Sequence, residues 1–494
     1  MSSRPRHSAE KRVAVEPLDA AALERLALLD RVARWPVLAL VVSGLFWAVI
    51  AGGLQVIAAI KLHAPGFLAD TAWLTYGRVA PAAANLFVLG FGIPMGLGVA
   101  AWLTSRLGSV PLAWRGMMLV GVKAWSLGLL VGVVGILGGR GTGIEGLELP
   151  AFALPIMLPG YLLMAAPVLR TFAQREPGEV YVSQWYVLAA VVTFPWFQLA
   201  GTLVAVWFPL RGVLPAMAGA WFLHGVFVLW FLALALAVVF YFVPKLVGRP
   251  LPSRNVALFG FWMLIIAGPI GGPARFIGGP FPAWLPSLGV VGNVWLLVPL
   301  VAVAVNLLLV LRGQRTLVKS SNALGFTVFS LAACLLWFGL NIVNSLGFFR
   351  HHTQFTLFTP GLDWLLLWGG FGTAMLGAVY YLVPRLMGAE WMRPAWVRMH
   401  LGLVAGAVVV LVGAHLLGGW LHGSALRDPT VPFVDVARRY IPFAATGTLA
   451  WLLLLGANLL LTVQIGWLLW TTHGASCVPE VRSWLRPETR EVNP

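Results

Sequence analysis

WFLHGVFVLWFLALALAVVFYFVPKLVGRP, residues 221–250, is one long apolar run that contains a single histidine, His224, and turns basic directly after Pro244. A second apolar run, FGFWMLIIAGPIGGPARFIGGPFPAWLPSLG at 259–289, is broken at Gly268-Pro269 and Gly272-Pro273. An α-helix rises about 1.5 Å per residue, so the stretch from His224 to Pro244 covers about 30 Å, the thickness of the hydrocarbon core of a bilayer. These two runs therefore predict transmembrane helices, the second of them interrupted.

The composition extends this prediction to the whole chain. The 494 residues are 60% hydrophobic and 10% charged, and the mean hydropathy is +0.87, which is typical of a polytopic helical membrane protein. The two cysteines, Cys334 and Cys477, lie far apart, so the sequence indicates neither a disulfide framework nor a zinc site. The net charge of +16 comes mostly from residues that flank apolar runs. It indicates orientation in lipid rather than binding to nucleic acid.

The predicted organisation is a basic cytoplasmic arm at 1–35, one membrane domain at 36–472 and a cytoplasmic tail at 473–494. Part of the arm is amphipathic and is expected to lie on the membrane surface. We predict twelve spans, at 36–60, 79–104, 116–138, 150–172, 181–207, 213–243, 255–271, 288–312, 320–346, 362–386, 396–420 and 442–472. The arm, the tail and the loops on their side carry most of the Lys and Arg residues, so both termini are expected in the cytoplasm.

Short motifs distributed along the membrane domain are specific as a set. They include WLTYGR at 73–78, REPGEVYVSQWYVLA at 175–189, HG at 224–225, YFVPK at 241–245, GP at 272–273, VNSL at 343–346, HHTQFT at 351–356, GAVYYLVPRL at 377–386 and GGWLHG at 418–423. In these motifs the chain resembles subunit I of the heme–copper oxidases, most closely the cbb-type (C-family) cytochrome c oxidases. The resemblance implies an all-α bundle of about twelve transmembrane helices in a bacterial plasma membrane.

The resemblance also implies where metal ligands should stand, because the family binds two hemes and one copper ion through six histidines. The first copper ligand corresponds to His224, but the adjacent pair of copper histidines corresponds to Ala274 and Arg275. Alanine offers no lone pair, and a guanidinium stays protonated and repels a metal cation. Copper binding by His224 alone is therefore not expected, and His224 is interpreted as a vestigial position.

The heme-ligand positions are changed in the same way. The ligand on the second helix corresponds to Ala83. The pair on the tenth helix corresponds to Thr359 and Gly361 when counted forward from HHTQFT, or to Leu362 and Trp364 when counted back from YYLVPRL. No position in either register is a histidine, so we expect neither heme nor copper as a cofactor.

The remaining histidines leave an alternative open. His63, His351, His352, His400, His415 and His422 lie near span ends or in loops. Interfacial or hydrogen-bonded structural roles are favoured for them over a relocated heme site.

Three charges fall within or at the edge of the apolar runs, where a charge is expensive and usually has a partner. Arg275 stands where copper would lie, and we predict that it pairs with Asp363 at the head of the tenth span. The alternative is that both residues face the aqueous rim. Lys123, in the third span, either faces the interior or extends to the interface.

These observations give three functional hypotheses. The first is a non-catalytic subunit (a pseudoenzyme) in a respiratory electron-transport complex, in contact with membrane lipid and with other membrane or cytochrome c-type subunits. The second is an active terminal oxidase or nitric oxide reductase with relocated ligands. The third is an ion or proton pathway through the emptied cavity, using Arg275 and Lys123.

Overall fold

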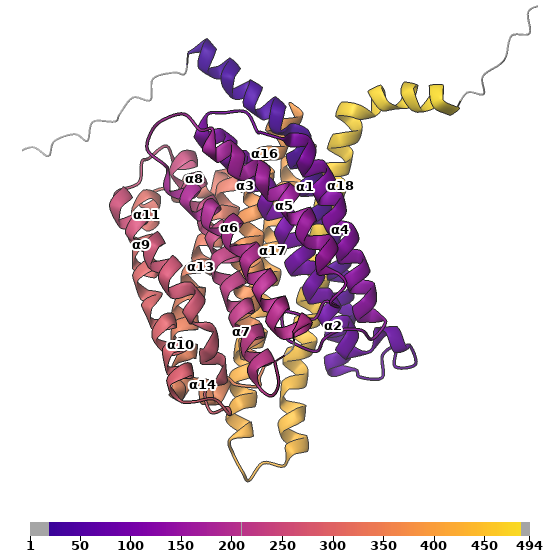
Figure 1. The fold of residues 1–494 in the computed structure, drawn as a ribbon, viewed down its shortest axis with the longest axis vertical. Helices are drawn as coiled ribbons and strands as arrows, with labels where there is room; N and C mark the ends of the chain where they lie inside the picture. Colours follow the sequence, from indigo (N-terminus) through magenta and orange to yellow (C-terminus); the bar gives the residue numbers. More distant parts are fainter. Residues whose placement is uncertain (1–18, 209, 486–494) are drawn as a thin grey trace, which may run out of the picture.

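The computed structural model describes residues 19–208 and 210–485. Over these residues the chain is helical and contains no β-strand. Twelve helices or runs of helices are long and apolar enough to cross a membrane, which confirms the predicted number. They form one elongated bundle in which the start of α1 and the end of α18 lie at the same end (Figure 1).

The spans are built from the following elements. They are α1 (Ala20–His63); α2 (Tyr76–Asn85), η2 (Leu86–Phe91) and α3 (Gly92–Gly108); α4 (Arg115–Leu137); α5 (Leu154–Ala173); α6 (Val182–Thr202) and η3 (Leu203–Trp207); α7 (Leu214–Val226), η4 (Phe227–Leu232) and α8 (Ala233–Val247); α9 (Arg254–Ala267), η5 (Gly268–Ile270) and η6 (Gly272–Phe276); α10 (Trp284–Trp295) and α11 (Leu297–Leu311); α13 (Asn322–Ser345); α15 (Phe358–Trp364), η7 (Leu365–Gly372) and α16 (Thr373–Met387); α17 (Pro394–Leu426); and α18 (Phe433–Leu485). Three short helices lie between spans: η1 (Ala72–Leu74), α12 (Arg315–Ser320) and α14 (Gly347–Thr353).

The first helix differs from its prediction. From Ala20 onward the predicted surface segment and the first span are one continuous helix, α1, rather than two elements. The side chain of Asp19 accepts a hydrogen bond from the backbone N–H of Ala22 and so caps the helix. The earlier part of the predicted arm lies outside the described residues.

Three spans form the centre of the bundle. In the second, sixth and tenth spans 94–100% of the most apolar window is buried, against 39–56% in the other nine. Each of the three contains a π-helical segment, η2, η4 or η7. A π-helical segment adds a residue to the turn and is common at functional sites. The family resemblance places metal ligands on all three of these spans, and also on the seventh.

The interruption predicted in the seventh span is present. The α-helix α9 ends at Ala267, and two 3₁₀ turns, η5 and η6, carry the chain to Phe276. Glycines let this segment approach its neighbours closely: a Cβ atom on Gly289 of α10 would lie 2.3 Å from the backbone N of Ala274. The broken segment thereby brings Arg275 to the inside of the bundle.

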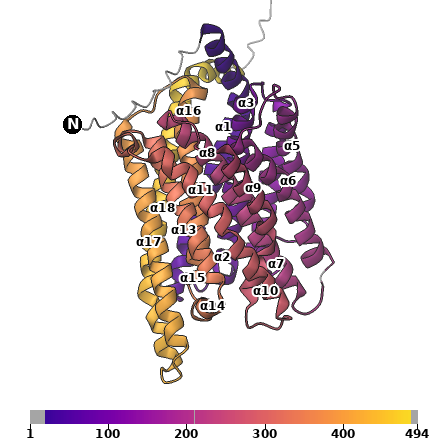
Figure 2. The ribbon, with the colours of Figure 1, turned by 90° about the vertical axis from the view of Figure 1, so that its left-hand side faces the viewer.

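The last two spans form a long hairpin. Helices α17 and α18 pack side by side, and their connection extends beyond the other helices at the end opposite the start of α1 (Figures 1 and 2). Two inner helices end at the other side of the bundle with the same pattern. YFVPKLVG closes α8 and YLVPRLMG closes α16, and each final glycine adopts a left-handed conformation with φ of +73° (Gly248) or +65° (Gly388).

Candidate functional site: the former copper centre

A small polar cavity lies between α7, η6, α10, α13, α14 and α15. It brings together six of the residues that the sequence singled out: His224, Ala274, Arg275, Thr359, Leu362 and Asp363. Its volume of about 30 Å³ is enough for roughly two water molecules. The predicted copper position and one residue from each register of the tenth-span heme ligands, Thr359 and Leu362, therefore border a single chamber.

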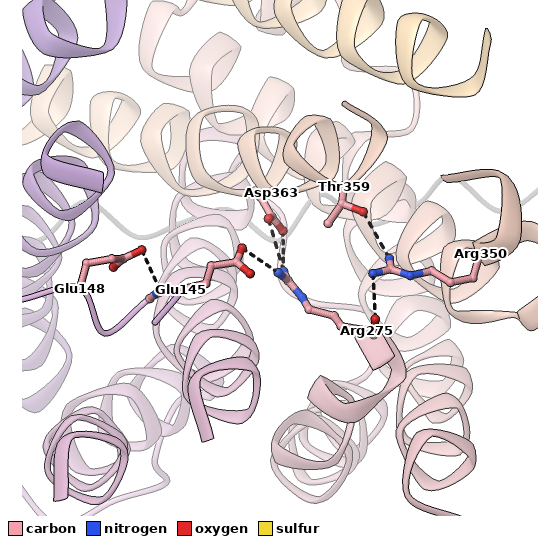
Figure 3. Close-up of polar contacts among 7 residues, drawn as sticks. Glu145, Glu148, Arg275, Arg350, Thr359 and Asp363 are labelled. Atoms are coloured by element: carbon pink, nitrogen blue, oxygen red, sulfur yellow. Dashed lines mark hydrogen bonds and ion pairs between the residues drawn. The ribbon is translucent and has the colours of Figure 1, made fainter. Parts of the chain in front are cut away.

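The predicted contact between Arg275 and Asp363 is present. Nη2 of Arg275 lies 3.0 Å and 3.3 Å from the two carboxylate oxygens of Asp363, and only 17% and 20% of the two side chains are exposed (Figure 3). Nη1 donates to Glu145, 3.3 Å away, on the loop after α4. The Glu145 side chain is 74% exposed, so Asp363 is the main counter-ion of the buried guanidinium.

A second arginine, Arg350 of α14, borders the same cavity. It donates to Thr359 over 3.3 Å and to the backbone oxygen of Arg275 over 3.5 Å, while its Nε has no partner in the described part of the chain. Burial and the charge of Arg275 lower the pKa of Arg350 to about 10. Arg350 thus positions η6 through the backbone of Arg275 without a carboxylate of its own (Figure 3).

Amide side chains complete the wall of the cavity. Asn341 of α13 donates to Asn293 of α10 over 2.9 Å, and Asn293 donates to the backbone oxygen of Gly271 over 3.0 Å. Asn344 accepts a hydrogen bond from Thr353 over 2.6 Å. The first two bonds connect the eighth and ninth spans to the broken segment, and the third joins α14 to α13.

The described residues do not fit a copper ion. His224 is buried, and no other histidine borders the cavity. No group of three or more His, Cys, Asp or Glu side chains that could hold a metal ion occurs within residues 19–208 and 210–485. The guanidinium of Arg275 on η6 is already held by two carboxylates, and it adds positive charge where copper would need a ligand. His224 Nε2 itself has no hydrogen-bond partner among the described residues.

The heme-ligand positions do not fit a heme either. Ala83 is buried on α2, and aromatic rings fill the space around the facing part of the tenth span. The ring of Trp364 lies 5.4 Å from Phe87 of η2 and 4.6 Å from Trp451 of α18, and Phe87 lies 4.9 Å from Trp368. Trp364 therefore packs among rings of the second and twelfth spans, as a side chain that fills a former cofactor volume would.

Five of the other histidines have structural partners. His400 shares a hydrogen bond of 2.8 Å with Tyr380, His415 bonds to the backbone oxygen of Leu411 over 2.8 Å, and His63 bonds to Thr448 over 3.0 Å. The ring of His352 stacks on Trp420, and that of His422 lies tilted against Tyr440. None of these contacts pairs one histidine with another.

Two further positions lie away from the cavity. Lys123 is exposed on the outer face of α4, so it belongs to the lipid-facing side rather than to the interior. Cys334 is buried on α13.

Sequence reasoning missed Glu145, Arg350 and the amides at 293, 341 and 344. The amides could have been found, because polar residues inside apolar spans are rare and usually face a cavity or a partner. Asn341 and Asn344 stand three residues apart, which places them on one helix face. Glu145 carried no such signal, because it comes from a glycine-rich loop.

Comparison with known proteins agrees with this architecture. The family described as Cytochrome C and Quinol oxidase polypeptide I matches residues 36–459, so the chain belongs to the subunit I family of the heme–copper oxidases. It is 25% identical to the bacteroid cytochrome c oxidase subunit 1 homolog of Bradyrhizobium diazoefficiens over 85% of this chain and 81% of that relative. It is 24% identical to the Cbb3-type cytochrome c oxidase subunit CcoN1 of Stutzerimonas stutzeri over 77% of this chain and 82% of the relative. A solved heme–copper terminal oxidase dimer shares the fold, with a TM-score of 0.69, 13% identity and coverage of 95% of this chain and 86% of the other.

Proposed function

We propose that this chain is a non-catalytic membrane subunit of a respiratory electron-transport complex, derived from an oxidase subunit I. It keeps the twelve-helix bundle of its family and binds neither heme nor copper at the family's positions. It works beside other membrane or cytochrome c-type subunits in a bacterial plasma membrane, with both termini in the cytoplasm.

One observation supports this proposal: at the position where the family resemblance implies a copper ligand, the guanidinium of Arg275 is held by Asp363 and Glu145. A guanidinium neither coordinates a metal nor exchanges electrons, and its charge repels a metal cation. The rings around Trp364 support the same conclusion at the heme-ligand positions of the second and tenth helices. There, side-chain packing would take the place of a cofactor.

An absorption spectrum of the purified protein tests the proposal. We expect no Soret band and no copper above background by elemental analysis, while a catalytic cbb-type subunit I prepared in parallel shows both. A Soret band corresponding to one heme or more per chain would refute the proposal. Oxygen consumption that disappears in His224→Ala would establish the alternative, an active oxidase with relocated ligands.

A further inference from the structure

A cluster of basic side chains lies at the end of the bundle where α1 begins. Its members Lys245 and Arg385 stand at the far ends of the same spans that carry the cavity residues His224 and Asp363. The repeated ends of α8 and α16 supply two of its members. Lys245 donates to the hydroxyl of Tyr241 four residues earlier over 2.5 Å, and Arg385 donates to that of Tyr381 over 3.2 Å. The Lys245 ammonium also lies over the rings of Tyr241 and Tyr381, at 4.7 Å and 5.5 Å from their centroids.

The cluster contains one carboxylate, that of Asp30 on α1, and this group is already fully engaged. It accepts a hydrogen bond of 2.9 Å from the indole of Trp102 and lies 3.6 Å from Arg106 and 3.5 Å from Arg385. Asp30 is therefore shared by two arginines, and its side chain is only 10% exposed.

Three other cations of the cluster lack such a partner. Arg31, Arg34 and Lys245 have no carboxylate within 4 Å in the described part of the chain. The Nε atom of Arg34 is inaccessible and has no hydrogen-bond partner among the same residues. With Arg106 and Arg385, five cations surround one carboxylate, so the cluster carries an excess of positive charge.

A pocket of about 330 Å³ opens beside this cluster, between the first turns of α1 and the end of α16. Arg31, Arg34 and Arg385 line it together with Leu23 and Leu26. It thus has cationic donors on one side and an apolar wall on the other. The pocket adjoins the start of the first apolar span, which is the level at which lipid headgroups lie.

We propose that this pocket binds the phosphate group of an anionic phospholipid. The arginines supply fork-shaped donors that match phosphate oxygens, and the excess of charge favours an anion. Leu23 and Leu26 give the glycerol and the first acyl carbons an apolar surface, which free phosphate would not use. The site lies apart from the former copper centre and does not depend on whether the chain is catalytic.

The test is lipid binding by native mass spectrometry in detergent micelles, with phosphatidylglycerol, phosphatidylcholine and inorganic phosphate as separate probes. Wild type is expected to retain phosphatidylglycerol in preference to phosphatidylcholine, and less so as salt rises. The double substitution Arg34→Gln and Arg385→Gln should weaken phosphatidylglycerol binding roughly thirtyfold, at about 1 kcal/mol for each basic side chain near an anionic surface. Arg315→Gln, on exposed α12, is the matched control and should leave binding unchanged.

The charge-conserving double substitution Arg34→Lys and Arg385→Lys serves as a second variant if the glutamine variant folds poorly. It should retain most of the phosphatidylglycerol binding. Equal retention of phosphatidylcholine, or equal binding by the glutamine double variant and the Arg315 control, would overturn the proposal. Stabilisation by inorganic phosphate without any effect of phosphatidylglycerol would also overturn it, because the apolar wall would then play no part.

Discussion

Substituting Asp363 by Asn removes the main counter-ion of Arg275 with almost no change in volume. Both side chains are at least four-fifths buried, and the contact distances are 3.0 Å and 3.3 Å. Removing one partner of a buried ion pair leaves an uncompensated charge and costs about 3–5 kcal/mol. Because Glu145 still contacts the guanidinium from the exposed rim, we expect the lower end of that range, about 3 kcal/mol.

The matched control is Glu145→Gln, which removes the exposed partner of the same guanidinium. An exposed ion pair contributes about 0–1 kcal/mol, so this variant should stay within that range of wild type. The free energy of unfolding can be measured for both by titration with sodium dodecyl sulfate in mixed micelles. A double variant, Arg275→Met with Asp363→Leu, should recover most of the loss, because an apolar pair of similar volume leaves no buried charge.

The reasoning would be refuted if Asp363→Asn and Glu145→Gln lost the same stability within about 0.5 kcal/mol, the usual limit of additivity. It would also fail if the apolar double variant were no more stable than Asp363→Asn. Either result would mean that the guanidinium is solvated at the rim rather than confined within the former copper centre.

Three further predictions concern the surroundings of the site. Burial raises the pKa of Glu148, on the outer loop before α5, above its usual value of 4.5, so the folded protein binds its proton more tightly than the unfolded chain. The contribution of Glu148 to the free energy of unfolding is fully present below pH 4.5 and is lost as pH rises through its folded-state pKa. Glu148→Gln should therefore make the free energy of unfolding less dependent on pH over this range. Gly271→Ala should destabilise by several kcal/mol in a thermal unfolding assay, because the new Cβ would lie 2.3 Å from His224 Nε2, whereas Gly339→Ala, with open space around it, should stabilise by about 0.5–1 kcal/mol. Trp364→Ala should cost about 3 kcal/mol in the detergent titration, since it opens a cavity between the rings of Phe87 and Trp451. An unchanged free energy of unfolding would show that the Trp364 ring fills no essential volume.

Much of the fold follows from the sequence for a simple reason. Twelve apolar runs can only be helices in lipid, because every backbone polar group must be bonded within its own segment. The break after Ala267 was equally predictable, since prolines cannot continue the hydrogen-bond ladder. The start of α1 was not, because a polar helix outside the bilayer and an apolar one inside it can share one axis without any local signal.

Only the charged residues within the apolar spans allowed part of the candidate site to be predicted from the sequence. Arg275 and Asp363 are costly in an apolar bundle unless they meet, and their contact could be inferred from that cost alone. Arg350 and Glu145 lie in polar segments between spans, where a charge requires no partner. Their convergence depends on how the loops fold over the bundle, which short-range patterns do not specify.

The replacement of copper by Arg275 that we propose would also account for the carboxylates beside it. A metal cation in this chamber would compensate nearby negative charge, and its loss alone would leave Asp363 buried without a counter-ion. Arg275 supplies a fixed positive charge at the same place, with a geometry suited to two carboxylates and no capacity for electron transfer. In the proposed function, the chamber keeps its electrostatic balance without metal ligands. We therefore expect that Arg275→His would supply one imidazole but leave the buried Asp363 without its main counter-ion, so copper binding would require further substitutions.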